Sequence, residues 1–224
     1  MISIAIDGPS GAGKSSLAKA LAKDLGYVYV DTGAMYRSIG LYAVRAGVDP
    51  HDADAVAALL PQVKLGIRLI DGAQHIYLNG EDVSTAIRAE EIGMAASAVA
   101  AHPAVRSFLL DTQRDMAKKC SVIMDGRDIG TVILPDAEVK IFLTASPEAR
   151  ARRRYLELQQ KGENVTLDEV LADMIQRDRD DTTRAEAPLR QAEDAVLVDT
   201  SELTLEESMD AVEAVIRRVL EGQV

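Results

Sequence analysis

The sequence predicts an α/β fold in which one five-stranded parallel sheet is covered by helices on both faces. Five short apolar runs end in turn-forming or acidic residues, which is typical of strands buried in a parallel sheet. Segments with apolar residues at helical spacing lie between most of these runs. Strands that alternate with helices form a parallel sheet with helices on its two faces.

The expected core elements can be placed in chain order. Strands are expected at residues 2–8, 27–31, 121–125, 138–143 and 195–199. Helices are expected at residues 14–25, 35–46, roughly 97–119, 147–160, 167–181 and 204–220. Leu17 and Leu21 share one face of the first helix, and Gly26 is its expected C-terminal cap. The last helix carries Leu205 and Val212 on one apolar face, so we expect it to serve packing.

Aspartates stand where four of these segments meet the same edge of the sheet. Asp31, Asp125 and Asp199 end the second, third and fifth strands, and Asp7 precedes the glycine after the first. In open parallel sheets, ligands bind beyond the carboxyl ends of the strands. We therefore expect a polar site along this edge.

Residues 63–83 interrupt the alternation of strands and helices. Apolar and polar residues alternate there with period two, and Asp71-Gly72 and Asn79-Gly80 are hairpin turn signals. This segment is expected to form a small antiparallel hairpin or sheet inserted between the second and third core strands.

Composition limits the classes of function. With 224 residues, of which 47% are apolar, the chain fits one globular domain. A net charge of −11 argues against nucleic acid as a partner. Cys120 is the single cysteine and the three histidines are scattered, so neither a disulfide framework nor a zinc site is expected. Without a leader or a long apolar run, we expect a cytoplasmic protein that does not enter a membrane.

Residues 8–15, GPSGAGKS, match the phosphate-binding pattern G-x-x-x-x-G-K-[ST] and lie between an expected strand and an expected helix. Backbone N–H groups and the helix N-terminus would surround the phosphates, Lys14 would reach the β- and γ-phosphates, and Ser15 would bind Mg²⁺. The alternative is an ordinary glycine-rich turn. The expected ATP ligands in this loop are Gly8, Pro9, Ser10, Gly11, Ala12, Gly13, Lys14, Ser15 and Ser16.

Arginines are concentrated in the C-terminal third. Arg150, Arg153 and Arg154 are expected on one helix face, and Arg177, Asp181 and Arg184 follow at helical spacing beyond the loop at 159–164. A solvated face or a structural ion-pair ladder is the alternative. In a small chain that binds a triphosphate, we interpret both segments as a lid, because phosphoryl transfer needs charge neutralisation and exclusion of water.

Six longer motifs occur together, in the order and at the spacing found in one known protein family. They are IDGPSGAGKS at 6–15, DTGAMYR at 31–37, EDVSTAIR at 81–88, SAVAAHPAVR at 97–106, DGRDIGT at 125–131 and RDRDDTTRAEAPL at 177–189. With them the chain resembles the bacterial cytidylate kinase family from its first strand to about Asp199. The resemblance implies a P-loop kinase fold with a helical lid, a monomer, and transfer of the γ-phosphoryl group of ATP, bound with Mg²⁺, to CMP or dCMP.

The resemblance also implies site residues. Those for CMP are Thr32, Tyr36, Arg37, Ser97, Arg106, Asp125, Arg127, Asp128, Arg177, Asp181 and Arg184. The expected catalytic residues are Lys14, Arg127, Arg153, Arg154 and Arg184, with Arg150 on the ATP side. Asp125 would hold Mg²⁺ through water, and Asp128 would accept a hydrogen bond from the amino group of cytosine. Thr32 replaces the serine that many members carry. Ser15-Ser16 replaces Gly-Thr, and the register favours Ser15 as the metal ligand.

The expected division of the single domain is a core at about 1–31, 86–145 and 185–224, an acceptor-binding region at 32–85 and a lid at 146–184. Another small P-loop kinase, acting on UMP or AMP, is the alternative enzyme. A nucleotide-dependent switch is the alternative of another class, although the guanine-reading N-K-x-D pattern of GTPases does not occur.

Overall fold

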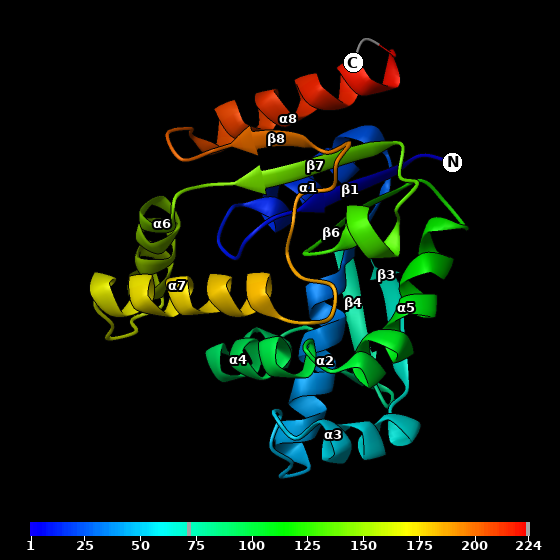
Figure 1. Ribbon diagram of the computed structural model, residues 1–224, viewed down its shortest axis with the longest axis vertical. Helices are drawn as coiled ribbons and strands as arrows, with labels where there is room; N and C mark the ends of the chain where they lie inside the picture. Colours follow the sequence, from blue (N-terminus) through cyan, green and yellow to red (C-terminus); the bar gives the residue numbers. More distant parts are fainter. Residues whose placement is uncertain (71–72, 223–224) are drawn as a thin grey trace.

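The structure, a computed structural model, describes residues 1–70 and 73–222 and contains the expected parallel sheet. Its strands run in the spatial order β2-β6-β1-β7-β8, and each neighbouring pair is parallel (Figure 1). The strands are β1 (Ser3–Asp7), β2 (Val28–Asp31), β6 (Val122–Gly126), β7 (Val139–Thr144) and β8 (Val196–Asp199). All five predicted strands are therefore confirmed. Because β1 lies at the centre, the loop that follows it opens at the middle of the sheet edge.

The inserted segment forms a separate antiparallel sheet of three strands, as its period-two pattern predicts. These strands are β3 (Leu65–Ile70), β4 (Ala73–Leu78) and β5 (Glu81–Asp82). Asn79 and Gly80 both have positive φ, 51° and 91°, which is the backbone of the tight turn expected at this dipeptide. The other predicted turn, Asp71-Gly72, lies outside the described residues.

Helices cover both faces of the parallel sheet. The long ones are α1 (Lys14–Leu25), α2 (Thr32–Arg45), α3 (Ala53–Leu59), α4 (Glu90–Val99), α5 (Pro103–Ala117), α6 (Pro147–Gln160), α7 (Leu167–Thr183) and α8 (Leu205–Leu220). Short helical turns are η1 (Leu60–Gln62), η2 (Ala86–Arg88) and the π-helix η3 (Ile129–Ile133). In Figure 1, α8 lies along β7 and β8, α2, α4 and α5 lie on the opposite side, and α6 and α7 stand together at one end.

The two faces of the sheet bury two separate apolar clusters. Along β1, Ile4 and Ile6 point to the cluster formed with α1 and α8, whereas Ala5 points to the cluster formed with α2 and α5. This alternation is the period-two geometry of a strand that is buried on both sides. Each fully buried isoleucine contributes roughly 1.5–3 kcal/mol relative to exposure, so the two clusters stabilise the sheet on both faces.

Two helix predictions need correction, and one helix was not predicted. The single helix expected at about 97–119 is two helices, because His102 precedes Pro103 and adopts extended angles of −86° and 123° that end helical structure. α2 begins at Thr32 rather than at 35, since the Asp31 carboxylate accepts the N–H of Ala34 and caps the helix. α3 was not predicted; its N-cap, Asp52, was the available signal.

Within residues 1–70 and 73–222, no helix is both long enough and apolar enough to cross a membrane.

Candidate active site

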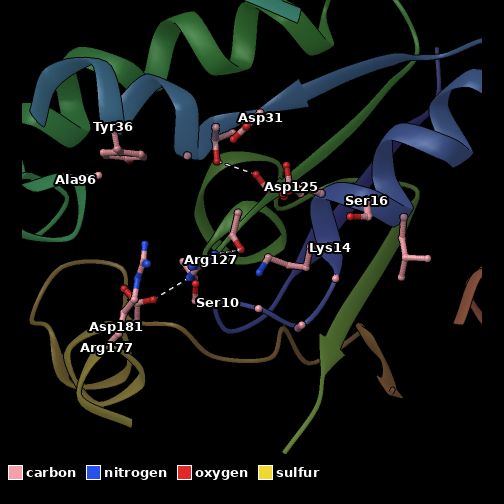
Figure 2. A pocket seen from close by; sticks show the side chains of 18 of the residues that line it. Ser10, Lys14, Ser16, Asp31, Tyr36, Ala96, Asp125, Arg127, Arg177 and Asp181 are labelled. Atoms are coloured by element: carbon pink, nitrogen blue, oxygen red, sulfur yellow. Dashed lines mark hydrogen bonds and ion pairs between the residues drawn. The ribbon is translucent and has the colours of Figure 1, made fainter. Parts of the chain in front are cut away.

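A cavity of about 630 Å³ opens at the carboxyl end of the parallel sheet. Figure 2 shows Lys14, Asp125 and Arg127 around the same hollow, with Arg177 and Asp181 reaching toward it from α7. Seven of the residues that line it are basic and five are acidic, although the whole chain carries a net charge of −11. Excess positive charge in the cavity of an acidic protein indicates a site for anions.

The glycine-rich loop forms one wall of this cavity, through residues 10–16. Gly8 has a φ of 149°, and a Cβ at this position would lie 1.9 Å from the carbonyl oxygen of Leu143, so only glycine fits. Gly13 has a φ of 92° and caps α1, whose first N–H groups therefore face the cavity. The loop thus has the shape of a phosphate cradle. Gly8 and Pro9, which were also predicted to bind ATP, do not line the cavity.

Lys14 is 5% exposed, and its Nζ donates to the carbonyl oxygen of Pro9 at 2.6 Å. Burial, together with the nearby Arg127, lowers the pKa of Lys14 well below its usual range. A bound polyanion would oppose this shift and restore the full charge of the ammonium group, so the lysine fits an anionic ligand.

Asp125 lies near the end of β6, next to the glycine-rich loop. Its Oδ2 accepts the Ser15 hydroxyl at 2.7 Å, and its Oδ1 accepts the Tyr29 hydroxyl at 2.9 Å. Burial, with Asp31 adding to it, raises the pKa of this carboxyl. Hydroxyl and carboxylate oxygens are the donors that Mg²⁺ prefers. The described residues contain no group of three or more metal-ligating side chains.

Asp128 also lines the cavity and is 3% exposed. Its carboxylate accepts a hydrogen bond from Arg106, and the Nη2 of Arg184 lies 3.7 Å from its other oxygen. Burial raises the pKa of Asp128 even though both arginines favour the charged form. Two arginines therefore fix the direction of one buried carboxylate, and Arg106 also stacks 5.7 Å from the centre of the Tyr36 ring.

Arg127 and Arg177 add positive charge to the cavity lining. Arg127 Nε donates to Asp181 at 2.7 Å, an interaction drawn in Figure 2. Burial, followed by the repulsion of Arg127, lowers the pKa of Arg177 to about 10. The buried Nε of Arg177 has no hydrogen-bond partner among the described residues. Neighbouring guanidinium groups with unpaired N–H donors can bind a phosphate group.

All eleven residues predicted to bind CMP line this one cavity, together with Lys14, Ser15, Ser16 and Arg153. The Thr32 hydroxyl already donates to the backbone oxygen of Asp125 at 2.8 Å. α7 ends at Thr183, and Arg184 is its C-cap residue. Arg184 therefore lies just beyond the helix on which it was expected together with Arg177 and Asp181.

The three arginines of α6 were expected on one helix face, but each contacts a different part of the protein. Arg150 is buried beneath the glycine-rich loop, where it donates to the carbonyl oxygen of Ser10 at 3.0 Å and pairs with Asp178. Arg154 pairs with Glu90 of α4 and does not line the cavity, and neither does Arg150. Arg153 lines the cavity and donates to the carbonyl oxygen of Thr200. Asp199, at the end of β8, also lies outside the cavity.

Sequence reasoning missed the end of the cavity next to Arg153. It is lined by Glu157, Leu203, Thr204, Leu205 and Ser208. Leu205 was expected in the packed face of α8 but is 64% exposed. Thr204 and Glu207 form a capping box, a signal that the sequence carries in the pattern T-x-x-E. The start of α8 lies at the cavity because β8 pairs with β7. The capping pattern does not predict this pairing.

The family model described as cytidylate kinase matches residues 4–218. A protein named cytidylate kinase from Citrifermentans bemidjiense is 52% identical over 217 residues, covering 97% of this chain and 93% of that protein. A cytidylate kinase from Caldicellulosiruptor bescii is 48% identical and covers 100% and 99% of the two chains. An uncharacterized protein from Eubacterium ventriosum shares the fold, with a TM-score of 0.50, 13% identity and 98% of both chains covered.

Proposed function

Because this chain belongs to the cytidylate kinase family, we propose that it transfers the γ-phosphoryl group of ATP to CMP or dCMP, giving ADP and (d)CDP. One observation supports this most strongly. A phosphate cradle and a set of arginines around a buried carboxylate share a single cavity, as transfer between two bound nucleotides requires.

The donor side is assigned to the glycine-rich loop. Its N–H groups and the start of α1 would hold the β- and γ-phosphates of ATP, and Lys14 would neutralise their charge. Ser15 and Asp125 would hold Mg²⁺, the latter through water. When bound, the ion neutralises phosphate charge and fixes the direction of the terminal phosphate. Tyr29 keeps Asp125 facing Ser15.

The acceptor side is assigned to the arginine-rich wall. Arg37, Arg127 and Arg177 would bind the monophosphate, and their mutual repulsion in the free protein would be relieved by it. Asp128 would accept the amino group of cytosine, while Ser97 and Arg106 contact the ring. Uracil has a carbonyl at that position, so two acceptors would face each other without a proton between them.

Catalysis then rests on position and charge rather than on a general base. The acceptor phosphate is already anionic, and Lys14, Arg153 and Arg184 would stabilise charge on the transferring group. Arg154 was predicted to join them and Arg150 to bind ATP. For either role, the arginine would have to leave its present carboxylate partner. We retain the proposed division into core, acceptor-binding region and lid, in which the ion pair between Arg154 and Glu90 joins the lid segment to α4 of the core. We also infer a cytoplasmic monomer, as the single cysteine and the family resemblance led us to expect.

A coupled assay that detects ADP tests the proposed function. The enzyme is given Mg-ATP with CMP, dCMP, UMP, AMP or GMP as the single acceptor. CMP and dCMP should give the largest kcat/KM, and ATP should not be hydrolysed quickly without an acceptor. Equal use of UMP or AMP would contradict the proposed acceptor, and acceptor-independent hydrolysis would indicate a switch or another ATPase.

A further inference from the structure

The π-helix η3 follows directly after Asp128 and carries the acceptor-side loop away from the cavity. It opens with the N–H groups of Val132 and Ile133 both donating to the carbonyl oxygen of Asp128, at 2.9 and 3.1 Å. Helical turns of this type are rare, and they often occur at functional sites. The backbone of Asp128 is therefore part of η3, and its side chain points to the acceptor site. Contacts that hold η3 in place therefore also hold Asp128 in place.

Asp7 holds the first turn of η3. This carboxylate ends β1 and is 4% exposed; its Oδ1 accepts the N–H of Ile129 and its Oδ2 accepts the N–H of Gly130, both at 2.7 Å. Burying a carboxylate is costly unless it is well hydrogen bonded. Burial raises the pKa of Asp7 to about 6, against the effect of the two backbone bonds. Such a group is not needed for packing, so its burial calls for another reason.

Arg114 holds the other end of η3. It extends from α5, and its Nε and Nη2 donate to the carbonyl oxygens of Ile133 and Val132 at 3.1 and 2.9 Å. The carboxylate of Asp7 thus accepts N–H groups at the start of η3, and the guanidinium of Arg114 donates to carbonyl oxygens at its end. This arrangement of charges matches the direction of the helix dipole. Arg106, the partner of Asp128, lies on the same α5.

We propose that Asp7 and Arg114 are positioning residues that clamp η3 at its two ends and so hold Asp128 and Arg127 in place for the acceptor nucleotide. This inference rests on the proposed function and adds two residues that support its acceptor site from outside the cavity lining. Both residues act through the backbone of η3.

The rival role for Asp7 is support of the glycine-rich loop, because it directly precedes Gly8. The two roles predict different kinetics. A clamp on η3 affects the acceptor, whereas support of the loop affects ATP. Both oxygens of Asp7 bind η3, which favours the acceptor.

The test compares Asp7→Asn, Arg114→Met and the core variant Val212→Ala. Asparagine keeps the shape of aspartate but turns an NH₂ group toward one of the two N–H donors. Methionine keeps much of the apolar stem of arginine and removes its donors. Val212 is fully buried on the opposite face of the sheet, so its truncation lowers stability without touching η3.

In both clamp variants KM for CMP should rise by about 10- to 100-fold, the preference for CMP over UMP should shrink, and KM for ATP should stay within about twofold. Val212→Ala should leave both KM values unchanged. A larger rise in KM for ATP than for CMP, or equal rises in both, would overturn the proposal.

Hydrogen exchange gives a second readout that needs no activity. The amides of Ile129 and Gly130 should exchange faster in Asp7→Asn, and faster exchange should extend along η3 in Arg114→Met, but not in Val212→Ala. Unchanged exchange in both clamp variants would overturn the clamp. If the wild-type enzyme did not phosphorylate CMP, the proposed function would fail, while the exchange data would still decide whether η3 is clamped.

Discussion

Replacing Asp128 with asparagine should weaken the choice between cytosine and uracil. In the wild-type site the buried carboxylate can only accept hydrogen bonds. It is held in one direction by Arg106 and by Arg184, which prevents it from turning away from an unsuitable base. An asparagine amide of the same shape can accept from the amino group of cytosine or, after rotation, donate to the carbonyl of uracil.

The size of the effect follows from the burial of this carboxylate, which uracil would leave facing a second acceptor. An unsatisfied buried polar group costs roughly 1–3 kcal/mol, which is about 10- to 100-fold in kcat/KM. The Asp128→Asn variant should lose this discrimination, so the CMP-to-UMP ratio of kcat/KM should fall by about that factor. Activity with CMP should also decrease, because Arg106 and Arg184 lose their charge partner.

The assay measures kcat/KM for CMP and for UMP at saturating Mg-ATP in both proteins. KM for ATP is the internal control, because Asp128 makes no contact with the glycine-rich loop in the proposed arrangement. A CMP-to-UMP ratio that stayed within about twofold of the wild-type ratio would refute the role of Asp128 in reading the base.

Three further predictions concern other parts of the site. Lys14→Met should lower turnover by two or more orders of magnitude with the fold retained, as judged by circular dichroism; near wild-type turnover would argue against the donor assignment. Tyr29→Phe should raise the Mg²⁺ concentration needed for half-maximal activity and weaken Mn²⁺ binding followed by electron paramagnetic resonance, since Asp125 loses a hydrogen bond; unchanged metal binding would exclude that role. Asp7 has a folded-state pKa of about 6, above its unfolded value of 3.8, so its contribution to stability is lost as pH rises through this window. The stability of Asp7→Asn relative to wild type should therefore increase by about 2 kcal/mol from pH 4.5 to pH 7 in urea titrations, and a difference independent of pH would contradict the raised pKa.

The parallel sheet could be predicted because its strands are continuous apolar runs and its first loop has a fixed glycine pattern. The acceptor residues were located through the family motifs, and the parallel sheet then brings their distant segments to one edge. The split between α4 and α5 was missed because apolar spacing continues across it, and only Pro103 marks the break.

Other features depend on tertiary contacts that local patterns do not contain. Arg150 and Arg153 are three residues apart on α6, yet one supports the glycine-rich loop from below and the other lines the cavity. Asp7 was noted only as a polar strand end. Its bonds to η3 join residues more than 120 positions apart, and they follow from the pairing of β1 with β6.

A crystal structure with CMP and a non-hydrolysable ATP analogue tests most directly whether one cavity holds both nucleotides. The triphosphate should lie along residues 8–16, the monophosphate should contact Arg37 and Arg127, and the cytosine amino group should lie within hydrogen-bonding distance of Asp128. CMP bound elsewhere, or bound here with its amino group directed away from Asp128, would contradict the account.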